Sequence, residues 1–286
     1  HHPDGGRGAY DPQARRRFLD FTQGCVRELL SNYGKIDILW YDVPQPFESY
    51  EGWESLRMNQ MARELQPHIL INNRSRLPED FGTPEGHVTA QDSDWEACMT
   101  FNGSSWGYVP SEQVAPDSYN VRGILRMLNT ACAGQGNLLL NIGPTPDGSV
   151  PAEAVEPLRQ TGQWLSRYGE AVYGRLDRAG YRANGCGGWS RKGRRAFFWC
   201  RIWPGREVGF GGFMTPLKAV RMLDTGAPVA FEQQGQRIIL RDLPAACGDP
   251  VAGMPVLEFE FAEAPRHVRC SLQPSLHDGQ DHAGDF

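Results

Sequence analysis

Hydrophobic and polar positions in the first half of the chain alternate between two spacings. Apolar residues at helical intervals predict helices at 11–33, 52–65, 118–133 and 151–168. Short, mostly apolar runs between them predict buried strands at 36–41 and 68–73, within 87–100, and at 137–142. Helices that alternate with such strands indicate βα units around a parallel sheet, so we assign residues 1–174 to an α/β domain.

The helical spacing disappears from about residue 175. Strand-like runs separated by Gly, Pro and Asp turns follow at 197–203, 219–223, 237–240 and 256–261. This pattern predicts an antiparallel β domain over 175–271. Residues 272–286 are polar and carry Gly, Asp and His, so we expect them to form a loose tail.

The composition is that of a globular protein and argues against nucleic-acid-binding and membrane-spanning classes. The 286 residues are 40% hydrophobic and 22% charged, as in ordinary globular proteins. A net charge of −5 without a Lys/Arg block argues against nucleic acid as a partner, and no apolar run approaches the ~20 residues that span a bilayer. The seven cysteines lack the spacing of a zinc site or of a disulfide framework.

A carboxylate ends the most apolar predicted strand. Asp42 follows this strand, and Trp40 lies two residues earlier on the same side of the pleat. Active sites of parallel α/β barrels lie at the carboxyl ends of the strands. A carboxylate beside an aromatic ring suits a sugar site, because the ring covers an apolar sugar surface. A capping or ion-paired Asp42 is the structural alternative.

Two glutamates could supply a second carboxylate. Glu85 is expected in a loop and Glu96 on or beside a strand. Retaining glycosidases use two carboxylates about 5–5.5 Å apart, one as nucleophile and one as acid and then base. Either glutamate could instead be a surface carboxylate. Arg74, after the second strand, could neutralise developing charge or bind a hydroxyl, or simply pair with Asp80 or Asp92.

Seven motifs then occur in order along the chain: YGKIDILWYD (33–42), NNR (72–74), GTPE (82–85), WEACMT (95–100), SWGY (105–108), GNLLLNIGPTPDG (136–148) and GEAVYG (169–174). They resemble the successive motifs of the α-L-fucosidases of glycoside hydrolase family 29. The resemblance covers about residues 1–260, since the C-terminal β region also looks like the β-sandwich of that family.

The resemblance implies a fold and a reaction. The fold would be a (β/α)8-type barrel followed by an antiparallel β-sandwich. The activity would be that of a retaining exo-glycosidase, which releases terminal α-L-fucosyl residues from glycoconjugates by double displacement without a metal or cofactor. Its partner would be a fucosylated glycan or glycoside, with neither nucleic acid nor membrane involved, and the oligomeric state stays open.

The resemblance also implies roles for single residues. Asp42 matches the nucleophile of the family, and Glu85 matches the acid/base of members with a similar Thr-Pro-Glu loop. Glu96 matches a glutamate proposed for that role in other members, and otherwise would bind substrate.

Three further positions belong to the expected sugar site. Trp40 and Trp106 match aromatic residues around the fucose methyl group, and Arg74 matches an arginine that contacts the sugar. Asn73 departs from the pattern, because many members carry Asp there, and this puts the local charge balance in doubt.

The start of the chain leads to a last expectation. HHPD at 1–4 resembles a segment that follows an early barrel strand in the family. About 175 residues precede the β domain, whereas a closed barrel takes ~250. We therefore expect an N-terminally incomplete barrel and, for the chain as it stands, poor catalysis. The alternatives are another retaining glycosidase on the same barrel and a non-catalytic glycan-binding fragment.

Overall fold

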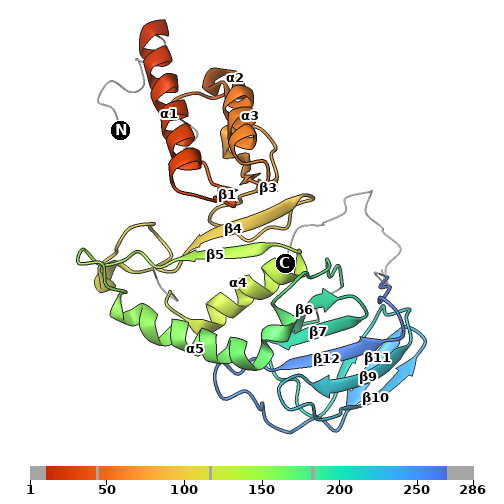
Figure 1. Cartoon of the computed structure of the whole chain (residues 1–286). Coiled ribbons are helices and arrows are strands. Elements are labelled where there is room, and N and C mark those ends of the chain that lie inside the picture. Colours follow the sequence, from red (N-terminus) through yellow and green to blue (C-terminus); the bar gives the residue numbers. More distant parts are fainter. Residues whose placement is uncertain (1–10, 43–44, 116–117, 182–183, 269–286) are drawn as a thin grey trace, which may run out of the picture. The chain divides into compact units, whose positions relative to one another are not determined.

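The computed structural model describes residues 11–42, 45–115, 118–181 and 184–268. The chain divides into two compact units, one formed by 1–100 with 136–141 and the other by 101–135 with 142–286. Figure 1 shows their helices and strands. The domain boundary expected at residue 174 stays a prediction, and the expected tail at 272–286 lies outside the described residues.

The first unit contains a row of parallel strands. In spatial order these are β1 (Ile38–Leu39), β2 (Leu70–Ile71), β3 (Phe81–Gly82), β4 (Asp94–Thr100) and β5 (Asn137–Asn141). A parallel bridge between Asn72 and Phe81 connects β2 to β3. Because all five strands run the same way, their carboxyl ends lie along one edge, where the motif residues follow.

Two of these strands are shorter than the predicted runs at 36–41 and 68–73. Backbone pairing between β1 and β2 covers only Ile38 with Leu70 and Leu39 with Ile71. Beyond that point the side chain of Asn72, rather than its backbone, bonds to Tyr41. The apolar run therefore extends further than the backbone ladder.

Three helices and a 3-10 turn complete the described part of the first unit. They are α1 (Pro12–Asn32), α2 (Tyr50–Trp53) and α3 (Ser55–Leu65), with the 3-10 turn η2 (Asn73–Ser75) after β2. Asp11 caps α1 by accepting a hydrogen bond from Gln13 N at 2.9 Å. The helix expected at 52–65 is divided at Glu54, whose φ of +53° breaks the helical backbone between α2 and α3.

The apolar sides of α1 and α3 meet the strands in one core. Its buried members are Val26, Leu30, Leu39, Met58, Met61, Ala62, Ile69 and Ile71. This packing anchors β1 and β2 and thereby the residues that follow each of them.

The second unit contains two longer helices and two antiparallel sheets. The helices are α4 (Val121–Ala133) and α5 (Ala152–Tyr168), with 3-10 turns η3 (Ser111–Gln113) and η4 (Gly169–Ala171). One sheet has the order β6 (Gly187–Lys192), β7 (Arg195–Cys200), β12 (Val256–Phe261), β9 (Leu217–Met222). The other has the order β10 (Ala230–Gln234), β11 (Arg237–Arg241), β8 (Val208–Phe210). The predicted antiparallel β region is confirmed.

The two central strands of the four-stranded sheet, β7 and β12, are buried on both faces. One face packs Trp189, Phe198 and Phe259 against Phe210 and Ile238 of the three-stranded sheet. The opposite face packs a second group against α4 and α5, including Leu125, Trp164, Phe197, Trp199 and Val256. The region is therefore a β-sandwich with helices on its outer side.

These elements confirm an α/β arrangement followed by antiparallel sheets, while closure of the parallel strands into a barrel stays a prediction. Among the described residues, no helix has both the length and the apolar character needed to cross a membrane.

Close packing at the start of β4 and β5 gives a first test. A Cβ added to Gly136 would lie 2.1 Å from Cε2 of the buried Trp95 indole. We expect Gly136→Ala to lower the free energy of unfolding by about 1–3 kcal/mol, because the ring must move within a packed interior. Gly24→Ala is the control: its Cβ meets nothing within 4 Å, and it should raise stability by about 0.5–1 kcal/mol within α1. Urea denaturation measures both, and a Gly136→Ala midpoint at or above wild type would contradict the packing.

Candidate active site

The backbone before Asp42 is held by a buried asparagine. Asn72 has no exposed surface. Its Oδ1 accepts a hydrogen bond from Tyr41 N at 2.9 Å, and its Nδ2 donates one to Tyr41 O at 2.8 Å. Both polar groups of the Tyr41 backbone are thus satisfied by one side chain, which fixes the direction in which the chain delivers Asp42.

Arg74 brings the two predicted catalytic carboxylates together. Its Nη1 donates to Asp42 Oδ1 at 3.0 Å and its Nη2 donates to Glu85 Oε2 at 2.5 Å. The arginine side chain is only 16% exposed, whereas those of Asp42 and Glu85 are 62% and 41% exposed. The guanidinium is therefore a mostly buried cation that binds two accessible carboxylates.

The alternative pairing of Arg74 with Asp80 is wrong. Asp80 Oδ2 instead accepts hydrogen bonds from Ile71 N at 2.7 Å and from Arg63 Nη2 at 2.9 Å. The geometry assigns Asp80 to the support of β2 and leaves Arg74 to the strand-end carboxylates.

Glu85 is more ordered than the loop expected from its Gly, Thr and Pro neighbours. It forms a parallel bridge with Cys98 of β4. Cys98 N donates to Pro84 O at 2.8 Å, and Gly86 N donates to Cys98 O at 3.0 Å. Backbone hydrogen bonds on both sides of Glu85 thus attach it to the neighbouring strand. The loop assignment is corrected to an irregular continuation of β3.

Trp40 and Glu96 complete the group in this unit. The Trp40 ring lies under the guanidinium, with Arg74 Cζ 4.8 Å from the ring centroid. Glu96 lies on β4, as expected; burial raises the pKa of its carboxyl, while the Trp40 indole acts in the opposite direction. Burial also raises the pKa of the adjacent Cys98 thiol to about 11. A half-buried Glu96 is thus easier to protonate than a free glutamate.

Trp106 lies in the second unit, on a turn organised by Asn102. Asn102 Oδ1 accepts hydrogen bonds from Ser104 N at 3.0 Å and Ser105 N at 2.9 Å, and its Nδ2 donates to Gly107 O at 3.1 Å. Trp106 is 43% exposed. Its place in a sugar site stays a prediction.

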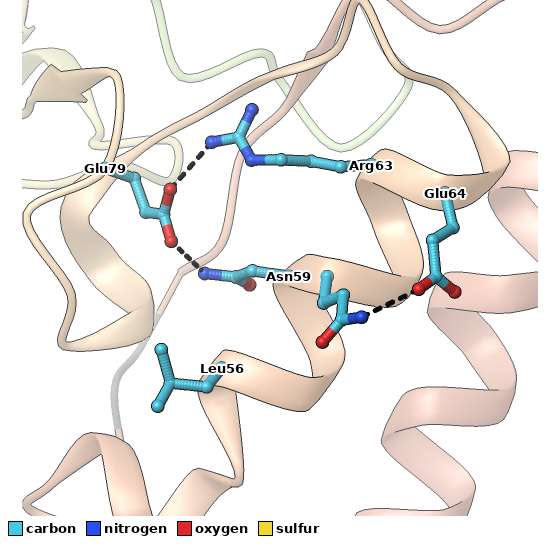
Figure 2. Close-up of a pocket in the computed structure, with 6 residues that line it drawn as sticks. Leu56, Asn59, Arg63, Glu64 and Glu79 are labelled. Atoms are coloured by element: carbon cyan, nitrogen blue, oxygen red, sulfur yellow. Dashed lines mark hydrogen bonds and ion pairs between the residues drawn. The ribbon is translucent and has the colours of Figure 1, made fainter.

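A polar network behind the site braces the segment after β2. Arg63 Nη2 and Asn59 Nδ2 both donate to Glu79, each at 2.7 Å (Figure 2). Asn59 Nδ2 also donates to Ser75 Oγ at 3.0 Å, and Ser55 Oγ donates to Ser75 O at 2.6 Å. Helix α3 therefore holds the turn that begins with Asn73 and Arg74.

The same network borders a surface hollow of about 410 Å³. Its lining is Leu56, Asn59, Gln60, Arg63, Glu64 and Glu79 (Figure 2). A second hollow, of about 470 Å³, lies along β8, β10 and β11 in the other unit. Neither lining includes Asp42 or Glu85. The polar groups of the first hollow bond to one another, so we assign them to bracing.

The sequence reasoning placed Asn72 and Thr83 within motifs but gave neither residue a role, whereas both contact the site. Thr83 Oγ1 accepts a hydrogen bond from Arg74 Nε at 3.0 Å. For Asn72, the available signal is a polar residue where an apolar strand pattern would continue.

For metals, the described part of the chain holds no group of three or more His, Cys, Asp or Glu side chains arranged to bind an ion.

Replacing Asn72 tests the support of Asp42. Asn72→Leu removes the hydrogen-bond partner of both Tyr41 N and Tyr41 O at a partly buried position, so we expect the free energy of unfolding to fall by about 2–4 kcal/mol. Asn32→Leu, at the exposed end of α1, should change it by less than about 0.5 kcal/mol. Urea unfolding measures both, and equal midpoints for the two variants would show that the Asn72 hydrogen bonds contribute nothing.

Comparisons by sequence relate this chain to known proteins. A family model described as "Alpha-L-fucosidase" matches residues 4–170. The plasma alpha-L-fucosidase of Pongo abelii is 42% identical over 159 residues, which are 51% of this chain and 33% of that protein. The tissue alpha-L-fucosidase of Homo sapiens is 39% identical over 82 residues, 29% of this chain and 17% of that protein.

Solved structures are similar over most of the chain. Alpha-L-fucosidase isoenzyme 1 from Paenibacillus thiaminolyticus superposes with a TM-score of 0.77 at 27% identity, over 87% of this chain and 63% of that one. The Thermotoga maritima alpha-fucosidase in complex with a mechanism based inhibitor gives a TM-score of 0.66 at 25% identity, over 85% and 57%. The chain thus spans less than two thirds of these structures and a third or less of the two curated relatives.

Proposed function

Because the chain belongs to the α-L-fucosidase family, we propose that this protein hydrolyses terminal α-L-fucosyl residues of glycoconjugates. The observation that carries the proposal is the convergence of Asp42 and Glu85 on Arg74 beside the Trp40 ring. Two accessible carboxylates next to an aromatic face are the groups that glycoside cleavage requires.

The proposed reaction is a double displacement with retention. Asp42 attacks the anomeric carbon and forms a glycosyl ester, while Glu85 donates a proton to the departing glycosidic oxygen. Glu85 then takes a proton from water, the water oxygen attacks the same carbon, and the bond to Asp42 breaks. Binding to the two terminal nitrogens of one guanidinium is compatible with the carboxylate separation of about 5–5.5 Å that this mechanism uses.

Further support for a covalent step comes from the similar Thermotoga maritima alpha-fucosidase, which was solved with a mechanism based inhibitor. In this chain, the Arg74 guanidinium would hold the Asp42 carboxylate in place by a hydrogen bond from Nη1. Trp40 would cover an apolar face of the sugar, and Glu96 would bind a hydroxyl. We further propose that β1–β5 form part of a (β/α) barrel whose strand ends carry this site.

The role of Asp42 has a matched control on the same segment. We expect Asp42→Ala to lower kcat/KM on an aryl α-L-fucoside by several orders of magnitude, because no glycosyl ester can form. Asp37→Ala removes an exposed aspartate paired with Lys35 and should leave kcat/KM within about twofold. A 2-fluorofucosyl fluoride should label the Asp42 peptide in mass spectrometry. More than about a tenth of wild-type activity in Asp42→Ala would exclude it as nucleophile.

The dependence of the hydrolysis rate on the leaving group shows which of Glu85 and Glu96 is the acid/base. Loss of the acid/base should slow substrates with poor leaving groups far more than activated aryl fucosides, and azide should restore turnover by replacing the activated water. We expect Glu85→Ala to show both effects and Glu96→Ala neither. The reverse result would exchange the two roles. Aryl glycosides of other sugars, assayed alongside, test the choice of fucose.

A further inference from the structure

Thr83 is the buried contact of the Arg74 guanidinium. Its hydroxyl accepts a hydrogen bond from Arg74 Nε at 3.0 Å and donates one to Asn73 Oδ1 at 3.0 Å. Arginine is only a donor and the amide oxygen only an acceptor, so the single hydroxyl proton goes to Asn73. Thr83 is 8% exposed, which protects both hydrogen bonds from water.

The other contacts of Arg74 do not prevent the guanidinium from rotating in its own plane. Its two terminal nitrogens bind carboxylates on accessible side chains, which can follow the guanidinium if it turns. The Trp40 ring supports the face of the guanidinium but resists rotation within that plane only weakly. The hydrogen bond from Nε to Thr83 is therefore the contact that opposes this rotation.

Thr83 is itself firmly held. Just before it, Gly82 pairs with Trp95 in the β3–β4 ladder, and just after it, Pro84 O accepts a hydrogen bond from Cys98 N at 2.8 Å. Asn73 begins η2, the turn that α3 braces. The Thr83 hydroxyl thus joins two rigid segments at the base of the arginine.

We propose that Thr83 is a positioning residue whose hydroxyl fixes the plane of the Arg74 guanidinium and so the directions of the two carboxylates it binds. Its effect on turnover rests on the proposed fucosidase function, whereas its effect on Arg74 does not. Small errors matter at such a site, since misplacement by ~1 Å can cost ~100-fold in rate.

The test compares Thr83→Val, which keeps the side-chain shape without the hydroxyl, with Thr83→Ser, which keeps the hydroxyl. Thr161→Val is the control, because Thr161 is also 8% exposed and donates a hydrogen bond to Pro157 O at 2.8 Å, on α5. Thr83→Ala replaces Thr83→Val if the latter does not fold.

The first readout is the Arg74 Nε–H resonance in 1H–15N spectra, assigned through its loss in Arg74→Lys. We expect slow hydrogen exchange in wild type, Thr83→Ser and Thr161→Val, and exchange at least about tenfold faster in Thr83→Val, because a lost hydrogen bond of ~1.5 kcal/mol corresponds to about that factor. Unchanged exchange in Thr83→Val would overturn the proposal, whether or not the protein cleaves fucosides.

The second readout is hydrolysis of an aryl α-L-fucoside. We expect Thr83→Val to lower kcat by about 10- to 100-fold with KM nearly unchanged, and Thr83→Ser to restore most of kcat. Equal losses in both variants that follow their melting temperatures, or an unchanged kcat in Thr83→Val, would overturn the catalytic part. A wild-type protein without turnover would refute the fucosidase function, and the exchange measurement would still decide the role of Thr83.

Discussion

The site depends on the sharing of one guanidinium by two carboxylates. Without Arg74, Asp42 and Glu85 would be two negative groups at the ends of β1 and β3, on either side of β2, and their repulsion would favour turning apart. A lysine could not replace this contact, because only a planar fork offers three directed donors in fixed relation. The remaining polar structure of the first unit, from Asn72 to the α3 network, holds the chain segments that supply these groups.

Each contributor to the site is fixed by a different kind of bond. A side-chain amide replaces backbone pairing before Asp42, backbone bonds to Cys98 hold Glu85, and a buried hydroxyl holds Arg74. Apolar packing of α1 and α3 on β1 and β2 provides the rigid base for all three. Hydrophobic burial thus holds β1 and β2 against the helices, and directional hydrogen bonds set where the side chains point.

Sequence patterns predicted the elements better than their connections. The helix at 118–133 and the strand at 137–142 agree closely with α4 and β5, because amphipathic spacing reflects burial directly. The break at Glu54 escaped prediction, since it depends on a local backbone choice rather than on polarity. Strand-end positions and the family resemblance pointed to Asp42, Glu85 and Arg74 as site residues. Neither predicted that both carboxylates bind Arg74, because hydrophobic spacing carries no information about contacts between distant strand ends.

The division of the chain between the units has a consequence for how the protein is made. Strand β5 belongs to the first unit, yet 35 residues of the second unit, 101–135, precede it in the chain. During synthesis the first unit therefore cannot complete its sheet when residue 100 leaves the ribosome. The edge of β4 that pairs with β5 stays unpaired until β5 has been synthesised. The two units are interleaved along the chain, so a cut at residue 100 would separate β4 from its partner strand β5.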